Sequence, residues 1–411
     1  MRGSTKLLAL SVPGIVRAIV IGAVATLVAV TTATWAGPRL TALEWSTYDR
    51  WLRDHPTSPG RQMLVVVARD AASEARLGSG AWDRAVLARV ISGLARAGAG
   101  AIGVDVRLGT SGGRARGGPS SDALLSQATK LAETVVYPIA LEPARGDGRT
   151  PGGPTLEGHS SWPMRSRIPL KLADAAPSAD SVTGLVREAR AIGHTLAPAD
   201  PDGVVRRVPL FVASGDRAVP AFALALAVTR MNASPESVTV ERGSLVIRPQ
   251  PATGITSEIH VSVDARANVL VDYRVRGAAA RVVPFQEIWT AIEAGQIDVV
   301  QQLVDDRVVL ILGEPGRELR QTPIGPMSDM EIQVHALDTL ASGQGLRGLP
   351  TRWIVPGALV VATLVAWLGL TRRWWMGPPP PSFSSPVTGR RVRSLSTVDS
   401  CCRSSSPAWP S

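Results

Sequence analysis

The chain has 411 residues, is 45% hydrophobic and carries a formal net charge of +10. This length leaves room for two domains beside membrane segments, and the hydrophobic content excludes a fully disordered chain. The two cysteines, Cys401 and Cys402, are adjacent near the C-terminus, which excludes a disulfide or a thiolate metal site in the rest of the sequence.

Two long apolar runs flank the middle of the chain. The first covers residues 15–36 (IVRAIVIGAVATLVAVTTATWA), and the second covers residues 353–371, with Trp353 and Trp367 near its ends. A helix needs roughly 20 apolar residues to cross a bilayer, and aromatic rings favour the interfaces. We expect two transmembrane helices. The first run also resembles a cleavable signal peptide, and we favour an uncleaved anchor because the run is longer than a usual signal core.

Basic residues predict the orientation of these spans. Arg2 and Lys6 precede the first span, and residues 372–411 contain six arginines against one aspartate. Because Lys and Arg accumulate on the cytoplasmic side, we expect residues 1–14 and 372–411 in the cytoplasm. The protein would then be a multi-pass protein of the inner (cell) membrane, with residues 43–349 as its extracytoplasmic domain.

The basic tail, residues 372–411, is rich in Pro and Ser and has no hydrophobic periodicity. Such composition predicts disorder, and basic charge beside a membrane is typical of contact with lipid headgroups. Since no nucleic-acid-binding motif accompanies the charge, we expect no nucleic-acid partner.

The middle region has the rhythm of an α/β domain. Continuous apolar runs are typical of strands buried on both faces, and helical spacing between them predicts parallel crossovers. We therefore expect a mixed α/β domain with a mainly parallel central sheet. We expect strands at 63–68, 101–106, 134–140, 204–212 and 307–312. We expect helices at 82–97, 124–132, 220–228 and 332–340. Four short strands that suggest an antiparallel layer are expected at 238–240, 245–247, 259–263 and 269–273.

Three glycine-containing motifs match known sites by letter only. Gly98–Gly103 fits a dinucleotide fingerprint, but a helix precedes it and a strand follows, the reverse of what phosphate binding needs. Ser111 stands in a Gly-x-Ser-x-Gly motif without the helix that a nucleophile elbow requires. Residues 200–203 (DPDG) lack the later ligands of a calcium loop and predict a tight turn.

Four residues are candidates for ligand binding. Asp105 ends a buried strand, at the sheet edge where ligands bind in open α/β sheets. Asp202, Arg206 and Arg207 lie in the DPDG turn and the strand after it. Neighbouring strand residues point to opposite faces, so we expect at most one of the two arginines to face a given pocket. No two of the five histidines have metal-ligand spacing, and we expect no catalytic residue, metal or cofactor.

The order of these segments resembles the CHASE2 domain, the extracytoplasmic sensory domain of bacterial membrane signalling proteins. The resemblance covers residues 43–349, and Asp200–Leu210 (DPDGVVRRVPL) is its closest match. The other segments that carry it are Tyr48–Arg50, Trp82–Arg84, Ala97–Val106, Pro220–Val228, Val308–Gly313 and Glu331–Leu340.

The resemblance implies a membrane-anchored sensor of signal transduction, with an unknown small-molecule ligand. CHASE2-like domains usually precede a nucleotide cyclase or a kinase, whereas residues 372–411 contain no such motif. We therefore expect a truncated or frame-shifted sensor, or one that acts through a separate cyclase or kinase, and a homodimer stays open. Two other hypotheses are an envelope hydrolase with Ser111 as nucleophile and a structural envelope protein.

Overall fold

The computed structural model describes residues 12–35, 37–56, 63–80, 82–105, 117–143, 161–163, 172–173, 175–177, 187–214, 217–241, 243–250, 258–274, 280–312, 318–343, 346 and 351–371. The chain divides into two compact units, Met1–Thr32 with Thr351–Ser411, and Ala33–Pro350. The predicted tail at 372–411 and Ser111 lie outside the described residues.

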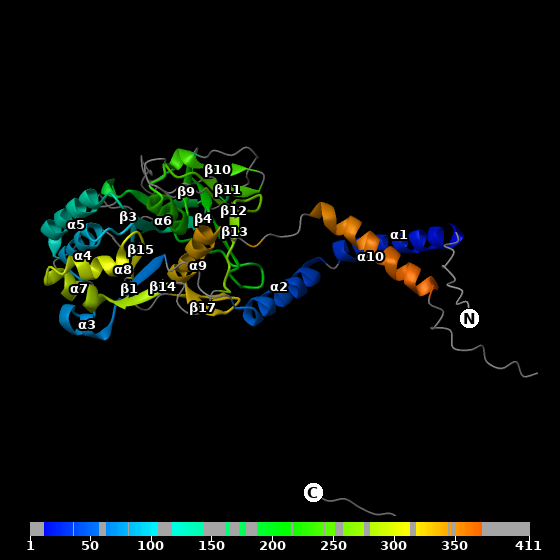
Figure 1. Cartoon of the computed structure of the whole chain (residues 1–411), viewed down its shortest axis with the longest axis horizontal. Helices are drawn as coiled ribbons and strands as arrows, with labels where there is room; N and C mark the ends of the chain where they lie inside the picture. Colours follow the sequence, from blue (N-terminus) through cyan, green and yellow to red (C-terminus); the bar gives the residue numbers. More distant parts are fainter. Residues whose placement is uncertain are drawn as a thin grey trace, which may run out of the picture. The chain divides into compact units, whose positions relative to one another are not determined.

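A six-stranded parallel sheet organises the larger unit, with the strand order β14-β1-β15-β2-β3-β6 (Figure 1). The register places Leu64 of β1 beside both Ala280 and Val308. The sheet confirms the predicted mixed α/β fold with a mainly parallel centre. Its strands are β1 (Leu64–Ala68), β2 (Ala101–Asp105), β3 (Val135–Ile139), β6 (Ala191–His194), β14 (Ala280–Pro284) and β15 (Val308–Leu312).

Alternating side chains of this sheet enter two separate cores. On β1, Val65 and Val67 belong to one core and Leu64 and Val66 to the other, as the two-residue period of a strand requires. The first core is covered by α4 (Arg84–Arg96), α5 (Gly118–Ala132), α7 (Phe285–Glu293) and α8 (Ile297–Val304). The second is covered by α6 (Phe222–Arg230) and α9 (Asp329–Ser342). Burial on both faces explains why the inner strands are continuously apolar.

Capping residues set the ends of several helices. Asp83 accepts a hydrogen bond from the Ala85 amide at the start of α4, and the φ of +81° at Gly98 follows its end. This confirms that Gly98 ends a helix and does not open a phosphate site. At the start of α9, Ser328 and Glu331 form a reciprocal capping box, which satisfies amides that the helix leaves free.

The predicted strand at 204–212 is wrong in its extent. The structure has two short strands there, β7 (Arg207–Pro209), which pairs with β13 (Asn268–Leu270), and β8 (Phe211–Ser214), which pairs with β9 (Arg217–Pro220). Pro209 offers no amide hydrogen, so one continuous ladder is interrupted. Three of the four short strands expected in an antiparallel layer form one, as β10 (Val238–Glu241), β11 (Ser244–Ile247) and β12 (Ile259–Ser262). The fourth, expected at 269–273, is wrong, because the structure has the shorter strand β13 there and pairs it with β7.

Further elements were not predicted from the sequence. Besides β6, β14, α7 and α8, they include α2 (Gly37–Asp54), which follows the first apolar helix, and α3 (Ala71–Leu77). The remaining ones are the 3₁₀ helix Pro235–Ser237 and the strand pairs β4 (Leu141–Pro143) with β5 (Ala175–Pro177) and β16 (Leu319–Thr322) with β17 (Gly325–Ser328).

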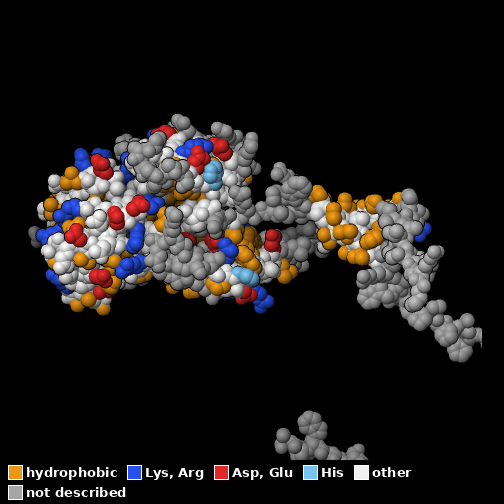
Figure 2. All heavy atoms as spheres, viewed as in Figure 1, with side chains coloured by type: hydrophobic (Ala, Val, Ile, Leu, Met, Phe, Trp, Pro, Cys, Tyr) orange, Lys and Arg blue, Asp and Glu red, His pale blue; other side chains and the backbone are white. Residues whose placement is uncertain are grey.

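The smaller unit contains two helices, α1 (Val12–Trp35) and α10 (Thr351–Thr371). Hydrophobic side chains cover the surface of this pair (Figure 2). Ala18, Gly22 and Thr26 form one buried stripe on α1, and a Cβ added at Gly22 would lie 2.9 Å from the Thr363 Cα of α10. Within the described part of the chain, however, no helix combines the length and apolarity needed to cross a membrane, so the structure does not support the two predicted spans.

Candidate functional site

A tight turn places two aspartates within reach of Arg206. The Gly203 amide donates to the Asp200 carbonyl at 2.8 Å, and Gly203 has a φ of +83°, a conformation that glycine adopts without steric cost. The turn that we predicted at 200–203 is therefore confirmed. The turn directs the carboxylates of Asp200 and Asp202 towards the side chain of Arg206.

Arg206 is the centre of an ionic cluster and is itself buried, since only 1% of its side chain is exposed. Its guanidinium donates to both Asp49 oxygens at 2.8 and 2.7 Å. It also donates to both Asp202 oxygens at 2.9 and 2.7 Å and to Asp200 at 3.1 Å. We call Asp49, Asp200, Asp202 and Arg206 the Arg206 cluster. Its forked geometry is one that arginine forms and lysine cannot reproduce.

The charges of this cluster stabilise one another. Burial disfavours the Arg206 cation, but hydrogen bonds to the three aspartates outweigh this effect and raise its pKa. The hydrogen bond from Arg206 in turn lowers the pKa of Asp202. Removing Arg206 would leave the buried carboxylate of Asp49 uncompensated, which is far more costly than losing an exposed ion pair.

The cluster attaches α2 to the α/β domain. Asp49 lies on α2, and Trp45 and Arg53 lie four positions before and after it, so the three residues share one face of the helix. Trp45 lies under both arginines, with its ring centre 5.1 Å from the Arg206 guanidinium and 4.9 Å from that of Arg207. Arg53 donates to the Pro323 carbonyl at 2.7 Å.

A second arginine contacts the neighbouring face of α2. Arg274 donates to both carboxylate oxygens of Asp272, the closest at 2.6 Å, and its guanidinium lies 5.1 Å from the ring centre of Trp51. Cation–π contacts of this kind contribute roughly 0.5–2 kcal/mol each. Three arginines therefore contact α2: Arg206 by ionic and aromatic contacts, and Arg207 and Arg274 by aromatic contacts.

Three polar atoms on or near α2 are buried and have no hydrogen-bond partner among the described residues. They are Tyr48 Oη, Tyr273 Oη and His335 Nδ1. The rings of Tyr273 and His335 lie 5.3 Å apart. Burial raises the pKa of Tyr48 and of Tyr273 and lowers the pKa of His335, so all three side chains are neutral near pH 7. Neutral, unpaired polar groups lower the stability of the site they occupy.

The structure brings three of the four predicted ligand-binding residues together. Asp202, Arg206 and Arg207 gather at Trp45, whereas Asp105 is buried at the carboxyl end of β2, in register with Leu312. Both arginines reach the Trp45 ring but have different ionic partners, and the expectation that at most one of them faces a given pocket stays a prediction. Arg206 lies outside the regular strand β7, and both side chains are long.

Sequence reasoning missed the residues that α2 contributes. Trp45, Asp49 and Arg53 recur at four-residue spacing, and Leu52 beside them is fully buried. This spacing is a helical signal, but Asp49 meets Arg206 across 157 positions of the chain. A single sequence contains no information on such a pairing.

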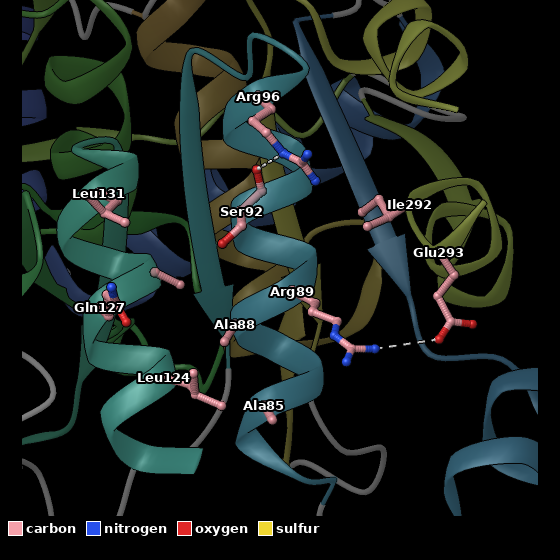
Figure 3. Close-up of a pocket in the computed structure, with 11 residues that line it drawn as sticks. Ala85, Ala88, Arg89, Ser92, Arg96, Leu124, Gln127, Leu131, Ile292 and Glu293 are labelled. Atoms are coloured by element: carbon pink, nitrogen blue, oxygen red, sulfur yellow. Dashed lines mark hydrogen bonds and ion pairs between the residues drawn. The ribbon is translucent and has the colours of Figure 1, made fainter. Parts of the chain in front are cut away.

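A groove of about 610 Å³ lies between α4 and α5 (Figure 3). Ala85, Ala88 and Ser92 form the α4 wall, and Leu124 and Leu131 of α5 are 51% and 75% exposed. Arg89 and Glu293 face one another across its rim at 3.8 Å. The groove has mixed apolar and polar walls, and the carboxylate of Glu293 at its rim is paired with Arg76 and Arg89.

A smaller cavity of about 30 Å³ lies between α6, α9 and the first residues of β1 and β15. Its walls are apolar except for Arg230 and Asp338. Among the described residues, no group of three or more His, Cys, Asp or Glu side chains is arranged to hold a metal ion.

Comparison with known proteins identifies the class of this domain. The CHASE2 domain family matches residues 25–371, which include the α/β unit, the Arg206 cluster and α2. No protein with a curated description matches the chain. No solved structure matches it either. The chain belongs to the CHASE2 domain family, which is a family of sensory domains.

Proposed function

We propose that this chain is a membrane-anchored sensor whose α/β domain lies outside the inner membrane and signals through α2. The observation that carries the proposal is the Arg206 cluster, which joins α2 to the turn before β7 by a buried bidentate contact to Asp49 and a part-buried one to Asp202. Because α2 follows α1 after a single residue, a displacement of α2 acts directly on the first apolar helix.

The apolar helices support the membrane attachment in this proposal. Large apolar side chains are exposed along α1 and α10, Leu27 and Val365 being two of the most exposed. Small residues at Ala18, Gly22 and Thr26 allow close approach of a second helix, as in helix pairs that associate in lipid. The apolar runs at 15–36 and 353–371 of the sequence motivate this attachment, whereas no described helix has the length and apolarity needed to cross a membrane.

Signalling in this scheme follows from two states of the α2 contact. In one state Arg206 holds Asp49, and in the other α2 is released or shifted. A ligand changes their populations only through different affinity for the two states. The partners in this proposal are a small-molecule ligand, a separate cyclase or kinase and a second copy of the chain. The proposal assigns no catalytic activity, no cofactor and no nucleic-acid partner.

Reporter fusions test the placement. Alkaline phosphatase fused after Leu349 is expected to be active, and green fluorescent protein fused after Arg373 is expected to fluoresce. Fusions of the two reporters in the exchanged positions serve as matched controls and should be inactive and dark. Fluorescence from a protein fused after Leu349 would show that the α/β domain stays in the cytosol, and the proposed function would then be wrong.

A further inference from the structure

The cavity between α6 and α9 contains an unpaired carboxylate. Its apolar wall includes Met63, Met231 and Leu337, and its charged residues are Arg230 and Asp338. Arg230 is already paired, since it donates to the Asp306 carboxylate at 2.8 Å and to the Asp306 carbonyl at 2.9 Å. Asp338 makes no hydrogen bond and no ion pair with any described residue.

An isolated carboxylate in such a place is unfavourable. Transfer of a charge from water to apolar surroundings is costly unless a partner is supplied. Burial, and then the nearby negative charge of Asp272, raises the pKa of Asp338. A cation placed beside Asp338 would offset both causes, because it pairs the buried carboxylate and screens it from Asp272.

The walls determine what kind of cation fits. Several aliphatic side chains surround the carboxylate, so the ligand needs a short apolar body beside its positive group. The present volume of about 30 Å³ holds roughly one water molecule. Met63 and Met231 are unbranched and adopt many rotamers, so they can move aside for a larger group.

We infer that this cavity is the ligand site of the domain and that it takes a small organic cation, a primary ammonium group on a short aliphatic chain. The ammonium pairs with Asp338, and the chain packs between α6 and α9. This inference rests on the proposed sensor function and names its ligand class.

The position of Asp338 connects the cavity to α2. The next residue of α9, Thr339, accepts a hydrogen bond from the Asp272 amide at 3.0 Å. Asp272 in turn holds Arg274, which lies over Trp51 of α2. A cation at Asp338 changes the field at Asp272 and so acts on the residues that hold α2, while α9 is also the last described helix before α10.

Calorimetric titration of the purified full chain in detergent tests the inference. The probe is n-butylammonium chloride, with n-butanol and sodium butyrate as matched neutral and anionic probes. Saturable binding of butylammonium is expected, with the Kd for the other two at least tenfold weaker. Equal affinity for butanol, or no saturable binding of butylammonium, would overturn the inference.

Two variants locate the binding. Asp338→Asn keeps the shape of the side chain and is expected to weaken butylammonium binding at least tenfold. Ala341→Leu keeps the carboxylate but fills the cavity, and it is expected to abolish binding by exclusion. Glu287→Gln, at an exposed position of α7, is the control and should bind like the parent chain. Retention of affinity in both cavity variants would contradict the site.

Failure of this inference and failure of the proposed function give different results. If the reporter fusions show an extracytoplasmic domain but butylammonium does not bind, the sensor proposal stands and the ligand class is wrong. If butylammonium binds at Asp338 but the domain is cytosolic, the cavity is confirmed and the membrane sensor is rejected.

Discussion

Arg206 is a single buried cation that pairs with three carboxylates. Its neighbour Arg207 allows the contribution of a buried arginine to be compared with that of a more exposed one. Arg207 is 38% exposed, and its ion pair with Asp264 is 4.0 Å long. Both guanidinium groups contact Trp45, so the two residues differ mainly in burial and in the number of charges they neutralise. The stability of the α2 attachment should therefore depend on Arg206 and very little on Arg207.

Replacement of the two arginines by methionine measures this difference. Arg206→Met leaves three aspartates without their counter-charge and is expected to lower the free energy of unfolding by about 3–5 kcal/mol. Arg207→Met removes an exposed pair and should cost below about 1 kcal/mol. Urea unfolding followed by tryptophan fluorescence provides the measurement. Equal losses in the two variants would show that the buried cluster is not what holds α2.

His194 determines part of the acid stability. Its ring is fully buried, and neither nitrogen has a hydrogen-bond partner in the structure. Burial lowers its pKa from 6.5 to about 3, so between these values the unfolded chain binds a proton that the folded chain does not. The free energy of unfolding is thus highest above pH 6.5 and falls towards pH 3, by about 1.4 kcal/mol per pH unit.

Unfolding measured as a function of pH tests this effect. His194→Gln removes the titrating group and is expected to flatten the dependence between pH 6.5 and 3. His260→Gln, at an exposed site, should leave the slope of the parent chain unchanged. A slope that persists in His194→Gln would assign the acid sensitivity to other groups, such as Asp202. The pKa of Asp202 is lowered in the folded state, so its carboxylate stabilises the fold until the pH falls below the ordinary pKa of an aspartate.

At the scale of elements, α2 and the α1–α10 pair form their contacts in different ways. Helix α2 uses buried ionic and aromatic contacts, while α1 approaches α10 through small side chains. Gly22 is a point of close approach, since any side chain there meets the backbone of Thr363. The helix pair therefore tolerates little change at this position.

Gly22→Leu is expected to push α1 and α10 apart, at a cost of about 1–3 kcal/mol for overpacking. Gly369→Leu is the matched control, because nothing lies within 4 Å of a Cβ at Gly369. Spin labels at the exposed residues Val28 and Val355, in a chain with Cys401 and Cys402 changed to Ser, report the separation by pulsed electron resonance. An unchanged distance in Gly22→Leu would exclude close packing at Gly22.

The sequence predicted elements better than it predicted contacts. The inner strands β1, β2, β3 and β15 were found because burial on both faces leaves a continuous apolar run. The edge strand β14 was missed because the charged Arg281 interrupts its apolar run, which Pro284 ends after only two valines. Asp202, Arg206 and Arg207 were found as a local cluster, but their partner Asp49 was not, because residues distant in sequence leave no joint pattern in one chain.

At the scale of the whole molecule, stability should decrease from the middle of the sheet to its edges. Strand β15 lies between β1 and β2, and both faces of the sheet are buried there, whereas β14 has one neighbour among the described strands. Amides that open only on global unfolding exchange slowest, and edges open in smaller fluctuations.

Hydrogen exchange followed by mass spectrometry measures this order. Peptides covering 308–312 are expected to exchange slowest, and those covering 280–284 several-fold faster under the same conditions. In Arg206→Met, peptides of α2 should lose protection more than those of β15. Similar protection of 280–284 and 308–312 would mean that the edge of the sheet is covered.

The strand order of the sheet also affects how the chain becomes folded. Strand β1 forms early in synthesis, but its neighbours are β14 and β15, in register with Ala280 and Val308. Pairings between segments so far apart make folding slow, because a long loop has to close before they form. The apolar strand Leu64–Ala68 must therefore stay without its sheet neighbours until most of the polypeptide has been made, and exposed apolar segments of this kind are prone to aggregation.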